Sequence, residues 1–371
     1  MKHFVLAPDS FKGTMDANEV CAIWSEVIRA NIPDAQIACF PMADGGEGMV
    51  DALVHICGGK RLYATVSGPM GKHMQAAYGI LQSGVAVIEM AACAGLPLVG
   101  NNKNPLIATT YGVGELLLDA TKHGVKEVII GLGGSATNDC GIGMAAALGY
   151  RFLNMAGREV EPLAKNMRTI AHIVPPDAIP KMTITAACDV DNPLYGPTGA
   201  TYTFGMQKGA EGNTLALLDD GLVNMAEVIL RDLGTDVAQM PGAGAAGGMG
   251  AGVVAFLNGS LKSGIDLLLD AANFNAALKK ADMVFTGEGR IDGQSVRGKV
   301  PVGISRRAKK FGIPCIALCG SIGDGVEKVY DEGINAVFAA VKGACTFDQI
   351  KETCHDDMRQ LADAVVRTLC I

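Results

Sequence analysis

The sequence predicts an α/β protein in which a parallel-sheet domain is interrupted by a second, mixed α/β domain. Short apolar runs typical of strands alternate with amphipathic helical patterns at both ends of the chain, and this alternation breaks in the middle. The length of 371 residues is enough for two or three hydrophobic cores. Hydrophobic residues make up 49% of the chain and charged residues 19%, which indicates a compact globular protein.

Charge and hydropathy argue against two classes of partner. The net charge is −7 and Lys and Arg form no dense run, so we do not expect nucleic-acid binding. No apolar stretch reaches the roughly 18 residues that a membrane span needs. The first residues, MKHFVLAPDS, enter a strand pattern without the apolar segment of a signal peptide. We therefore expect a cytoplasmic protein with no membrane partner.

The cysteines and histidines do not suggest a metal or disulfide framework. The eleven cysteines are scattered and include no C-x-x-C pair; Cys315 and Cys319 lie within an apolar strand pattern. We interpret them as reduced core residues. The six histidines are isolated, with no spacing typical of zinc ligands.

The first sixty residues have the pattern of strand, helix, strand, helix. Apolar runs predict strands over 3–7 and 36–40, and apolar residues spaced for one face predict helices over 15–30 and 49–57. The strands run into polar, glycine-bearing loops, PDSFKGT and PMADGGEG. Because parallel strands place their carboxyl ends at one edge of a sheet, where ligands bind, the two loops should share a rim. The polar residues on this rim are Asp9, Ser10, Lys12, Asp44 and Glu47.

The alternation changes near Lys60, where we expect the second domain to begin. Three short strand patterns over 61–67, 75–81 and 85–90 are separated by turn sequences and predict an antiparallel meander. Helical patterns follow over 112–123, 215–232 and 245–258. The sequence PGAGAAGGMGAG, at the last of these, fits close helix packing and a ligand-facing role equally well.

Residues 128–149 form the most informative stretch, VIIGLGGSATNDCGIGMAAALG. Its pattern predicts a strand, a glycine turn and a helix that ends near Gly149. Backbone N–H groups at a helix start are unpaired and carry the positive end of the helix dipole, so this turn could bind an anion. The turn adds polar side chains at Ser135, Thr137, Asn138 and Asp139. Glycine that serves only to tighten the turn is the alternative.

A strand predicted over 182–188 ends in an Asp-x-Asp sequence, Asp189 and Asp191. Carboxylate oxygens suit Mg²⁺, so one carboxylate could hold this ion while the other acts as a base. The Asp-x-Asp pattern is common by chance and is weak evidence when taken alone.

The strand and helix alternation resumes near Ala281. Strands are predicted over 282–286, 315–318 and 334–339, and helices over 300–311 and 347–369. Residues 293–299 read G-x-x-x-x-G-K, but Val300 stands where a phosphate loop needs Ser or Thr, which argues against a Walker A loop. What remains is a charged cluster at a helix start, comprising Glu288, Arg290, Asp292 and Lys299.

Five motifs together resemble the bacterial glycerate kinase family, which is unrelated to P-loop kinases. They are PDSFKGT, PMADGGEGM, IIGLGGSATNDCGIGMAAALG, ACDVDNPLYGPTGA and TGEGRIDGQSVRGK, in this order along nearly the whole chain. The resemblance implies ATP-dependent phosphorylation of D-glycerate with Mg²⁺. It also implies a flavodoxin-like, Rossmann-like parallel-sheet domain over 1–60 and 281–371, interrupted by a mixed α/β domain over 61–280.

The shared-rim argument and the resemblance together suggest a role for each candidate residue. Lys12 and Lys299 would neutralise charge on the phosphoryl group, and the general base would be Asp44 or Asp191. Asp189 and Asp191 would ligate Mg²⁺. Contacts to glycerate would come from Ser10, Asp44 and Arg290, and contacts to ATP from Gly133, Gly134, Ser135, Asn138 and Glu288.

Three alternatives stay open at this point. The resemblance favours the 2-hydroxyl of glycerate as the acceptor, but no residue pattern distinguishes it from the 3-hydroxyl. Gly131, Gly133 and Ala136 resemble a dinucleotide fingerprint of an NAD-dependent dehydrogenase, although 151–154 lacks the acidic residue expected there. A non-catalytic sensor of small acids is the third. The pattern is compatible with a homo-oligomer and does not determine the oligomeric state.

Overall fold

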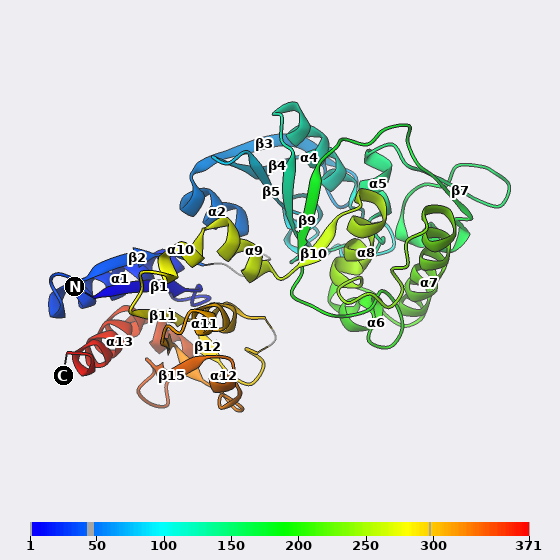
Figure 1. Ribbon diagram of the computed structural model, residues 1–371. Helices are drawn as coiled ribbons and strands as arrows, with labels where there is room; N and C mark the ends of the chain where they lie inside the picture. Colours follow the sequence, from blue (N-terminus) through cyan, green and yellow to red (C-terminus); the bar gives the residue numbers. More distant parts are fainter. Residues whose placement is uncertain (1, 43–47, 297, 371) are drawn as a thin grey trace. The chain divides into compact units, whose positions relative to one another are not determined.

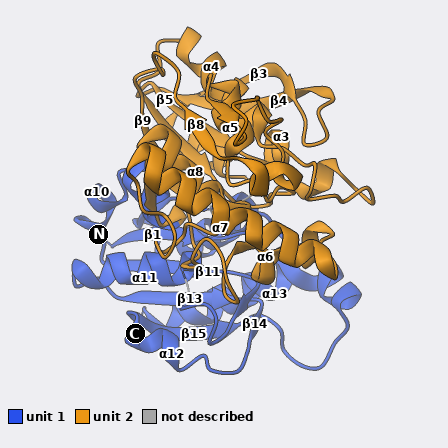
Figure 2. Ribbon diagram, turned by 90° about the vertical axis from the view of Figure 1, so that its right-hand side faces the viewer, with its two compact units in different colours: residues 1–44, 265–371 blue, residues 45–264 orange. Residues whose placement is uncertain are grey.

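The computed structural model describes residues 2–42, 48–296 and 298–370. The chain divides into two compact units, which Figure 2 colours separately. Unit 1 comprises Met1–Asp44 and Ile265–Ile371, and unit 2 comprises Gly45–Gly264. Both are mixed α/β structures with parallel strands, as the sequence predicts. None of the helices in the described ranges combines the length and apolarity needed to cross a bilayer.

Unit 1 is built on a five-stranded sheet in the order β15-β13-β11-β1-β2, and every neighbouring pair is parallel (Figure 1). Its strands are β1 (His3–Pro8), β2 (Gln36–Cys39), β11 (Met283–Gly287), β13 (Cys315–Cys319) and β15 (Ile334–Ala339). A second, two-stranded parallel sheet pairs β12 (Arg290–Ile291) with β14 (Ser321–Ile322).

Helices cover both faces of this sheet because side chains alternate between the faces along each strand. On β13, Ile316 and Leu318 pack with α1 (Ala17–Asn31) and α13 (Phe347–Thr368). Ala317 and Cys319 pack instead with α11 (Val300–Lys310) and α12 (Lys328–Asp331). Both α1 and α13 begin with a capping box, Asp16 with Glu19 and Thr346 with Gln349. The unit also contains α9 (Gly264–Ala271) and α10 (Phe274–Leu278).

Unit 2 contains a six-stranded sheet in the order β10-β9-β6-β5-β4-β3. Strands β3, β4 and β5 pair antiparallel, as the turn sequences predict, and the remaining neighbours are parallel. The strands are β3 (Gly59–Ser67), β4 (His73–Leu81), β5 (Val85–Glu89), β6 (Glu127–Gly131), β9 (Thr183–Ala187) and β10 (Ser260–Lys262). A separate hairpin-like pair joins β7 (Arg151–Leu153) to β8 (His172–Val174).

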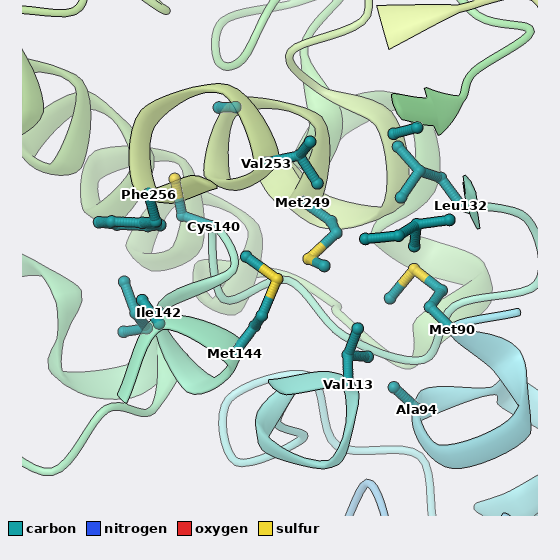
Figure 3. Close-up of a cluster of buried hydrophobic side chains, with 14 of the residues drawn as sticks. Met90, Ala94, Val113, Leu132, Cys140, Ile142, Met144, Met249, Val253 and Phe256 are labelled. Carbon is teal, nitrogen blue, oxygen red and sulfur yellow. The ribbon is translucent and has the colours of Figure 1, made fainter. Parts of the chain in front are cut away.

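The helices of unit 2 enclose one large core. They are α2 (Met49–Cys57), α3 (Ala91–Ala94), α4 (Tyr111–Lys122), α5 (Ile142–Ala147), α6 (Ala200–Phe204), α7 (Asn213–Leu233) and α8 (Ala245–Leu257), with 3-10 turns at Leu96–Leu98, Ala164–Thr169 and Met206–Lys208. Figure 3 shows part of this core, in which Met144, Met249 and Phe256 lie among smaller apolar side chains.

The glycine-rich start of α8 serves packing. A Cβ on Gly252 would lie 2.7 Å from the carbonyl oxygen of Cys140, and one on Gly247 only 2.1 Å from that of Thr137. Gly247 also has a φ of +72°, in a kink that spans residues 246–248. Of the two roles that the sequence left open, the structure therefore supports close helix packing.

The unit boundaries differ from the expected positions near Lys60 and Ala281. The expected boundaries would put α2 in unit 1 and α9 in unit 2, but each of these helices packs with the opposite unit. Helix α2 contacts β3, β4 and β5 of unit 2, and its Val50 N–H donates to Glu89 Oε1 at 2.8 Å. Helix α9 belongs to unit 1, where Arg307 of α11 pairs at 2.7 Å with Asp266 of α9 and with Asp270 of the same helix. The periodicity of a helix does not say which sheet the helix will cover.

Candidate functional site

The carboxyl ends of β1, β11 and β13 lie side by side and open into a cavity of unit 1, here called the unit 1 cavity. It has a volume of about 480 Å³. Backbone hydrogen bonds join the loops that form it: Asp9 N–H donates to Gly287 O at 2.8 Å, and Gly320 N–H to Glu288 O at 3.1 Å. The lining residues are Asp9, Ser10, Phe11, Lys12, Thr14, Glu288, Gly289, Arg290, Lys299, Val300, Gly320, Ser321, Val341, Phe347 and Ile350.

A glycine at the end of β11 permits this close approach of the loops. A Cβ on Gly287 would lie 1.9 Å from the carbonyl oxygen of Leu318 on β13, a distance that no side chain can occupy. Glycine at this position therefore lets β11 approach β13 and brings Glu288 directly to the sheet edge.

Glu288 is a buried carboxyl of the cavity, with 8% of its surface exposed. Its Oε1 accepts from Ser295 Oγ at 2.9 Å, and its Oε2 lies 3.2 Å from Lys299 Nζ. Burial raises the pKa of the Glu288 carboxyl, and the Lys299 charge opposes this rise. Lys299 immediately precedes α11, and its side chain is 38% exposed. The pair thus fixes a lysine ammonium at the wall of the cavity.

Further polar side chains of the cavity come from the segment after β1 and from the short strands β12 and β14. Arg290 is 64% exposed at its side chain and lies 3.5 Å from Asp292. Ser10 and Lys12 follow β1, where Asp9 Oδ1 accepts from the Ser10 backbone N–H at 2.7 Å. Six residues that the sequence singled out therefore line one cavity: Asp9, Ser10, Lys12, Glu288, Arg290 and Lys299. Asp44 and Glu47, which the sequence placed on the same rim, lie outside the described residues.

One wall of the cavity is apolar, and sequence reasoning did not find it. Val341, Phe347 and Ile350 line the cavity together with Phe11. Phe347 opens α13 and is 52% exposed, which is unusual for a large aromatic side chain. The sequence does show Phe347 as a large apolar residue in the first turn of a predicted helix. It does not show that this side chain points into a cavity.

In unit 2, two loops emerge at the carboxyl ends of neighbouring parallel strands. Strand β6 ends at Gly131 and pairs with Ala187 at the end of β9. The glycine turn with Gly133 and Gly134 follows β6, and Asp189 and Asp191 follow β9. The sheet therefore places both predicted segments at one edge, as the shared-edge argument requires.

The turn after β6 does not lead directly into a helix, which corrects the sequence-based expectation. Helix α5 begins only at Ile142 and contains six residues. The intervening segment is an irregular buried loop, held to residues near 95 by backbone bonds such as Leu96 N–H to Gly134 O at 2.8 Å. The donors available at this turn are thus loop N–H groups rather than those of a helix start. Gly134, exposed and with a φ of +73°, lies at the tip.

The polar side chains of this loop point inward. Asp139 is fully buried; its Oδ2 accepts at 2.9 Å from both the backbone N–H and the Oγ1 of Thr110. Asn138, also fully buried, donates to Thr201 Oγ1 at 3.1 Å. Burial raises the pKa of Asp139 despite these bonds. Asn138 is therefore placed to join the loop to α6, and Ser135, which is 5% exposed, lies nearer the loop surface.

Lys208, in the 3-10 turn Met206–Lys208, contacts this loop, and sequence reasoning missed it. It is 2% exposed, and its Nζ donates to Ser135 Oγ at 2.9 Å and to Thr137 O at 2.7 Å. Burial lowers its pKa to about 7, and the Asp139 charge opposes this shift. Lys208 lies far from the loop in the chain, within a sequence without apolar periodicity, so only the fold could reveal this contact.

The two aspartates after β9 are held differently. Asp189 Oδ1 accepts from Gly264 N–H at 2.8 Å and from Ser263 Oγ at 3.1 Å. Asp191 is exposed. Among the described residues, no group of three or more His, Cys, Asp or Glu side chains could hold a metal ion. Two carboxylates with further oxygen ligands from a nucleotide and water fit the way proteins bind Mg²⁺.

Comparisons with known proteins agree with this organisation. A model of the glycerate kinase family matches residues 4–370. A glycerate kinase of Halalkalibacterium halodurans is 46% identical over 94% of this chain and 93% of its own, and the glycerate 2-kinase of Escherichia coli is 42% identical over 99% and 98%. A crystal structure of a putative glycerate kinase 2 from Salmonella typhimurium superposes with a TM-score of 0.88 at 40% identity, covering 99% of this chain and 98% of that one.

Proposed function

Because this chain belongs to the glycerate kinase family, a family of phosphotransferases, we propose that it transfers the γ-phosphoryl group of ATP to the 2-hydroxyl of D-glycerate. The main structural support for this proposal is the unit 1 cavity. It combines the ammonium groups of Lys12 and Lys299 with the guanidinium of Arg290 at the edge of a parallel sheet. These groups suit a small substrate that carries a carboxylate and accepts a phosphoryl group.

In this proposal the cations of the cavity have separate tasks. The planar guanidinium of Arg290 matches the two oxygens of the glycerate carboxylate, and Ser10 offers a hydroxyl for a substrate hydroxyl. Lys299 stabilises negative charge on the phosphoryl oxygens during transfer. Its position is fixed by Glu288, whose Oε2 lies 3.2 Å from Nζ. A cation held before the reaction begins needs no rearrangement as charge develops.

Unit 2 contributes the nucleotide contacts in this proposal. The backbone of Gly133 and Gly134, at the exposed part of the turn, offers N–H groups to ATP phosphates, with Ser135 behind them. Lys208 positions Ser135 through the 2.9 Å hydrogen bond and adds positive charge beneath the turn. The support for this role is the shared edge of β6 and β9, from which the turn and the aspartates emerge together.

Asp189 and Asp191 would hold Mg²⁺, which neutralises phosphate charge when it is bound with the nucleotide. The proton of the attacking hydroxyl needs an acceptor. Asp191, exposed after β9, is one candidate, and Asp44, which lies outside the described residues, is the other.

Phosphorus NMR of the product tests the proposal directly. The full-length protein is incubated with ATP, Mg²⁺ and D-glycerate, and we expect the signal of 2-phosphoglycerate to grow as that of the γ-phosphate declines. The signal of 3-phosphoglycerate would overturn the choice of hydroxyl, and an absence of any phosphoglycerate would overturn the activity. Glycolate, which lacks the third carbon, serves as the control acceptor.

Calorimetry with a non-hydrolysable ATP analogue tests the nucleotide and metal assignments. We expect binding to strengthen at least ten-fold when Mg²⁺ is added, because the ion screens the phosphate charge. Equal affinity with and without Mg²⁺ would contradict the metal assignment. Preferential binding of NAD would favour the dehydrogenase alternative instead.

A further inference from the structure

A pair of cysteines in unit 1 is absent from the cavity lining and takes no part in the proposed reaction. Cys39 is the last residue of the edge strand β2 and is exposed, whereas Cys21 is buried on α1. Cys39 pairs with Leu6 of β1, and the Sγ of Cys21 lies 4.0 Å from the carbonyl oxygen of the same Leu6. The Cys39 backbone and the Cys21 sulfur therefore both lie beside Leu6.

One face of α1 carries groups that stabilise the thiolate form of Cys39. Cys21, Ser25 and Arg29 are spaced four residues apart, so they share a face of the helix. The Ser25 Oγ lies 3.4 Å from the Cys39 sulfur, and the Cys21 thiol and the Arg29 charge also act on this sulfur. The hydrogen bond from Cys21 is the largest of the effects that lower the pKa of Cys39 to about 6. The same bond, with burial, raises the pKa of Cys21 well above its usual range.

We propose that Cys39 reacts with hydrogen peroxide and that Cys21 converts the product into a disulfide that joins β2 to α1. The Cys39 thiolate attacks one peroxide oxygen, the O–O bond breaks, and hydroxide leaves, so that Cys39 becomes a sulfenic acid. The Cys21 sulfur then attacks the Cys39 sulfur, the S–O bond breaks, and water leaves with the proton of Cys21. In total the two thiols lose two electrons and two protons, and one peroxide becomes two waters.

Two other exposed cysteines provide internal controls. Cys345 donates to Gly343 O at 3.4 Å, and Cys370 donates to Val366 O at 3.4 Å. A carbonyl acceptor favours the protonated thiol, whereas the donors around Cys39 favour the thiolate. Accessibility alone would make all three cysteines react at similar rates, so a difference between them reports the surroundings of Cys39.

The first experiment labels the reduced, full-length protein at pH 6 with limiting iodoacetamide and measures each site by mass spectrometry. At this pH about half of the Cys39 thiols would be ionised, against well under one per cent of ordinary thiols; part of this advantage is offset by the weaker nucleophilicity of a low-pKa thiolate. We expect Cys39 to react roughly ten-fold faster than Cys345 and Cys370. Equal rates at the three sites would overturn the proposal.

The second experiment treats the protein with hydrogen peroxide, blocks the remaining thiols and maps disulfides. We expect a Cys21–Cys39 linkage that dithiothreitol reverses. In the variant Cys21→Ser the linkage cannot form, and a sulfenic acid at Cys39 should be trapped by dimedone. The variant Ser25→Ala should still form the linkage, but more slowly. A reduced Cys39 after treatment, or a linkage between other cysteines, would overturn the proposal.

Discussion

Both units place loops at the carboxyl ends of neighbouring parallel strands, yet they use charge in opposite ways. In unit 1, the side chains of Lys299 and Arg290 are 38% and 64% exposed and line a cavity. In unit 2, Lys208 is 2% exposed and donates to the loop itself. An exposed charge is available to a ligand, whereas a buried one fixes the backbone around it. Substitutions in unit 1 should therefore affect activity before stability, and substitution of Lys208 should affect stability first.

The largest effect on activity is expected for Asp191→Asn. This side chain is exposed, so the change should leave the unfolding temperature unaltered, while loss of the carboxylate lowers kcat by about a thousand-fold. Steady-state kinetics and thermal unfolding measure the two quantities. The matched variant Asp189→Asn disturbs the bonds from Ser263 and Gly264 and should also lower stability, by about 1 kcal/mol. Near-normal kcat in Asp191→Asn would remove this residue from the chemistry.

The variant Lys299→Ala tests the exposed charge of unit 1. We expect kcat/KM to fall by about 10²- to 10³-fold, because one preorganised cation at the phosphoryl group is lost. Lys309→Ala, on the helix that Lys299 precedes, removes an exposed lysine that donates to Asp331 O at 2.8 Å, and it should retain full activity. Similar values of kcat/KM for the two variants would show that Lys299 does not contribute to catalysis from its position in the cavity.

The variant Lys208→Met tests the buried charge of unit 2. The change removes two hydrogen bonds and the charge near buried Asp139, so we expect a loss of about 3 kcal/mol in the free energy of unfolding. Urea denaturation measures this loss. The control Lys165→Met alters an exposed lysine paired with Glu161 and should change stability by less than about 0.5 kcal/mol. Equal stabilities of the two variants would contradict the structural role.

The pH dependence of stability should identify Lys208 as well. Its pKa is about 7 in the folded protein and about 10.4 in an unfolded chain, so between these values the unfolded state binds more protons. The Lys208 contribution to the free energy of unfolding therefore rises with pH across this window, by up to about 1.4 kcal/mol per pH unit. Measured from pH 7 to 9, the stability difference between the wild type and Lys208→Met should grow. A constant difference would contradict the lowered pKa.

The smallest effect is expected for Glu288→Gln. The amide oxygen can still accept from Ser295 Oγ, but the charge that holds Lys299 is lost. We expect kcat/KM to fall by about ten-fold, or about 1.4 kcal/mol, since Lys299 stays present but less well positioned. Glu327→Gln, at an exposed glutamate before α12, is the control and should behave as the wild type. An unchanged rate in Glu288→Gln would show that Lys299 needs no positioning partner.

Comparison of the two edges also shows which parts of the candidate site could be predicted from sequence. Ser10, Lys12, Glu288 and Arg290 lie within a few residues of the ends of predicted strands, and Lys299 immediately precedes a predicted helix. A parallel sheet brings the ends of its neighbouring strands together. Lys208 and Phe347 do not follow a strand. Their contacts depend on how distant helices and loops pack, which local periodicity does not encode.

The sequence by itself indicated the strands of the two large sheets except β10, and the longer helices, because side-chain periods of 2 and 3.6 are local properties. It also determined the motifs that identify the family. Only the tertiary structure decided that α2 joins unit 2, that the loop after β6 is buried before α5 begins, and that Lys208 supports Ser135. These features depend on contacts between residues far apart in the chain, where burial and hydrogen bonding choose among arrangements that the local sequence allows equally.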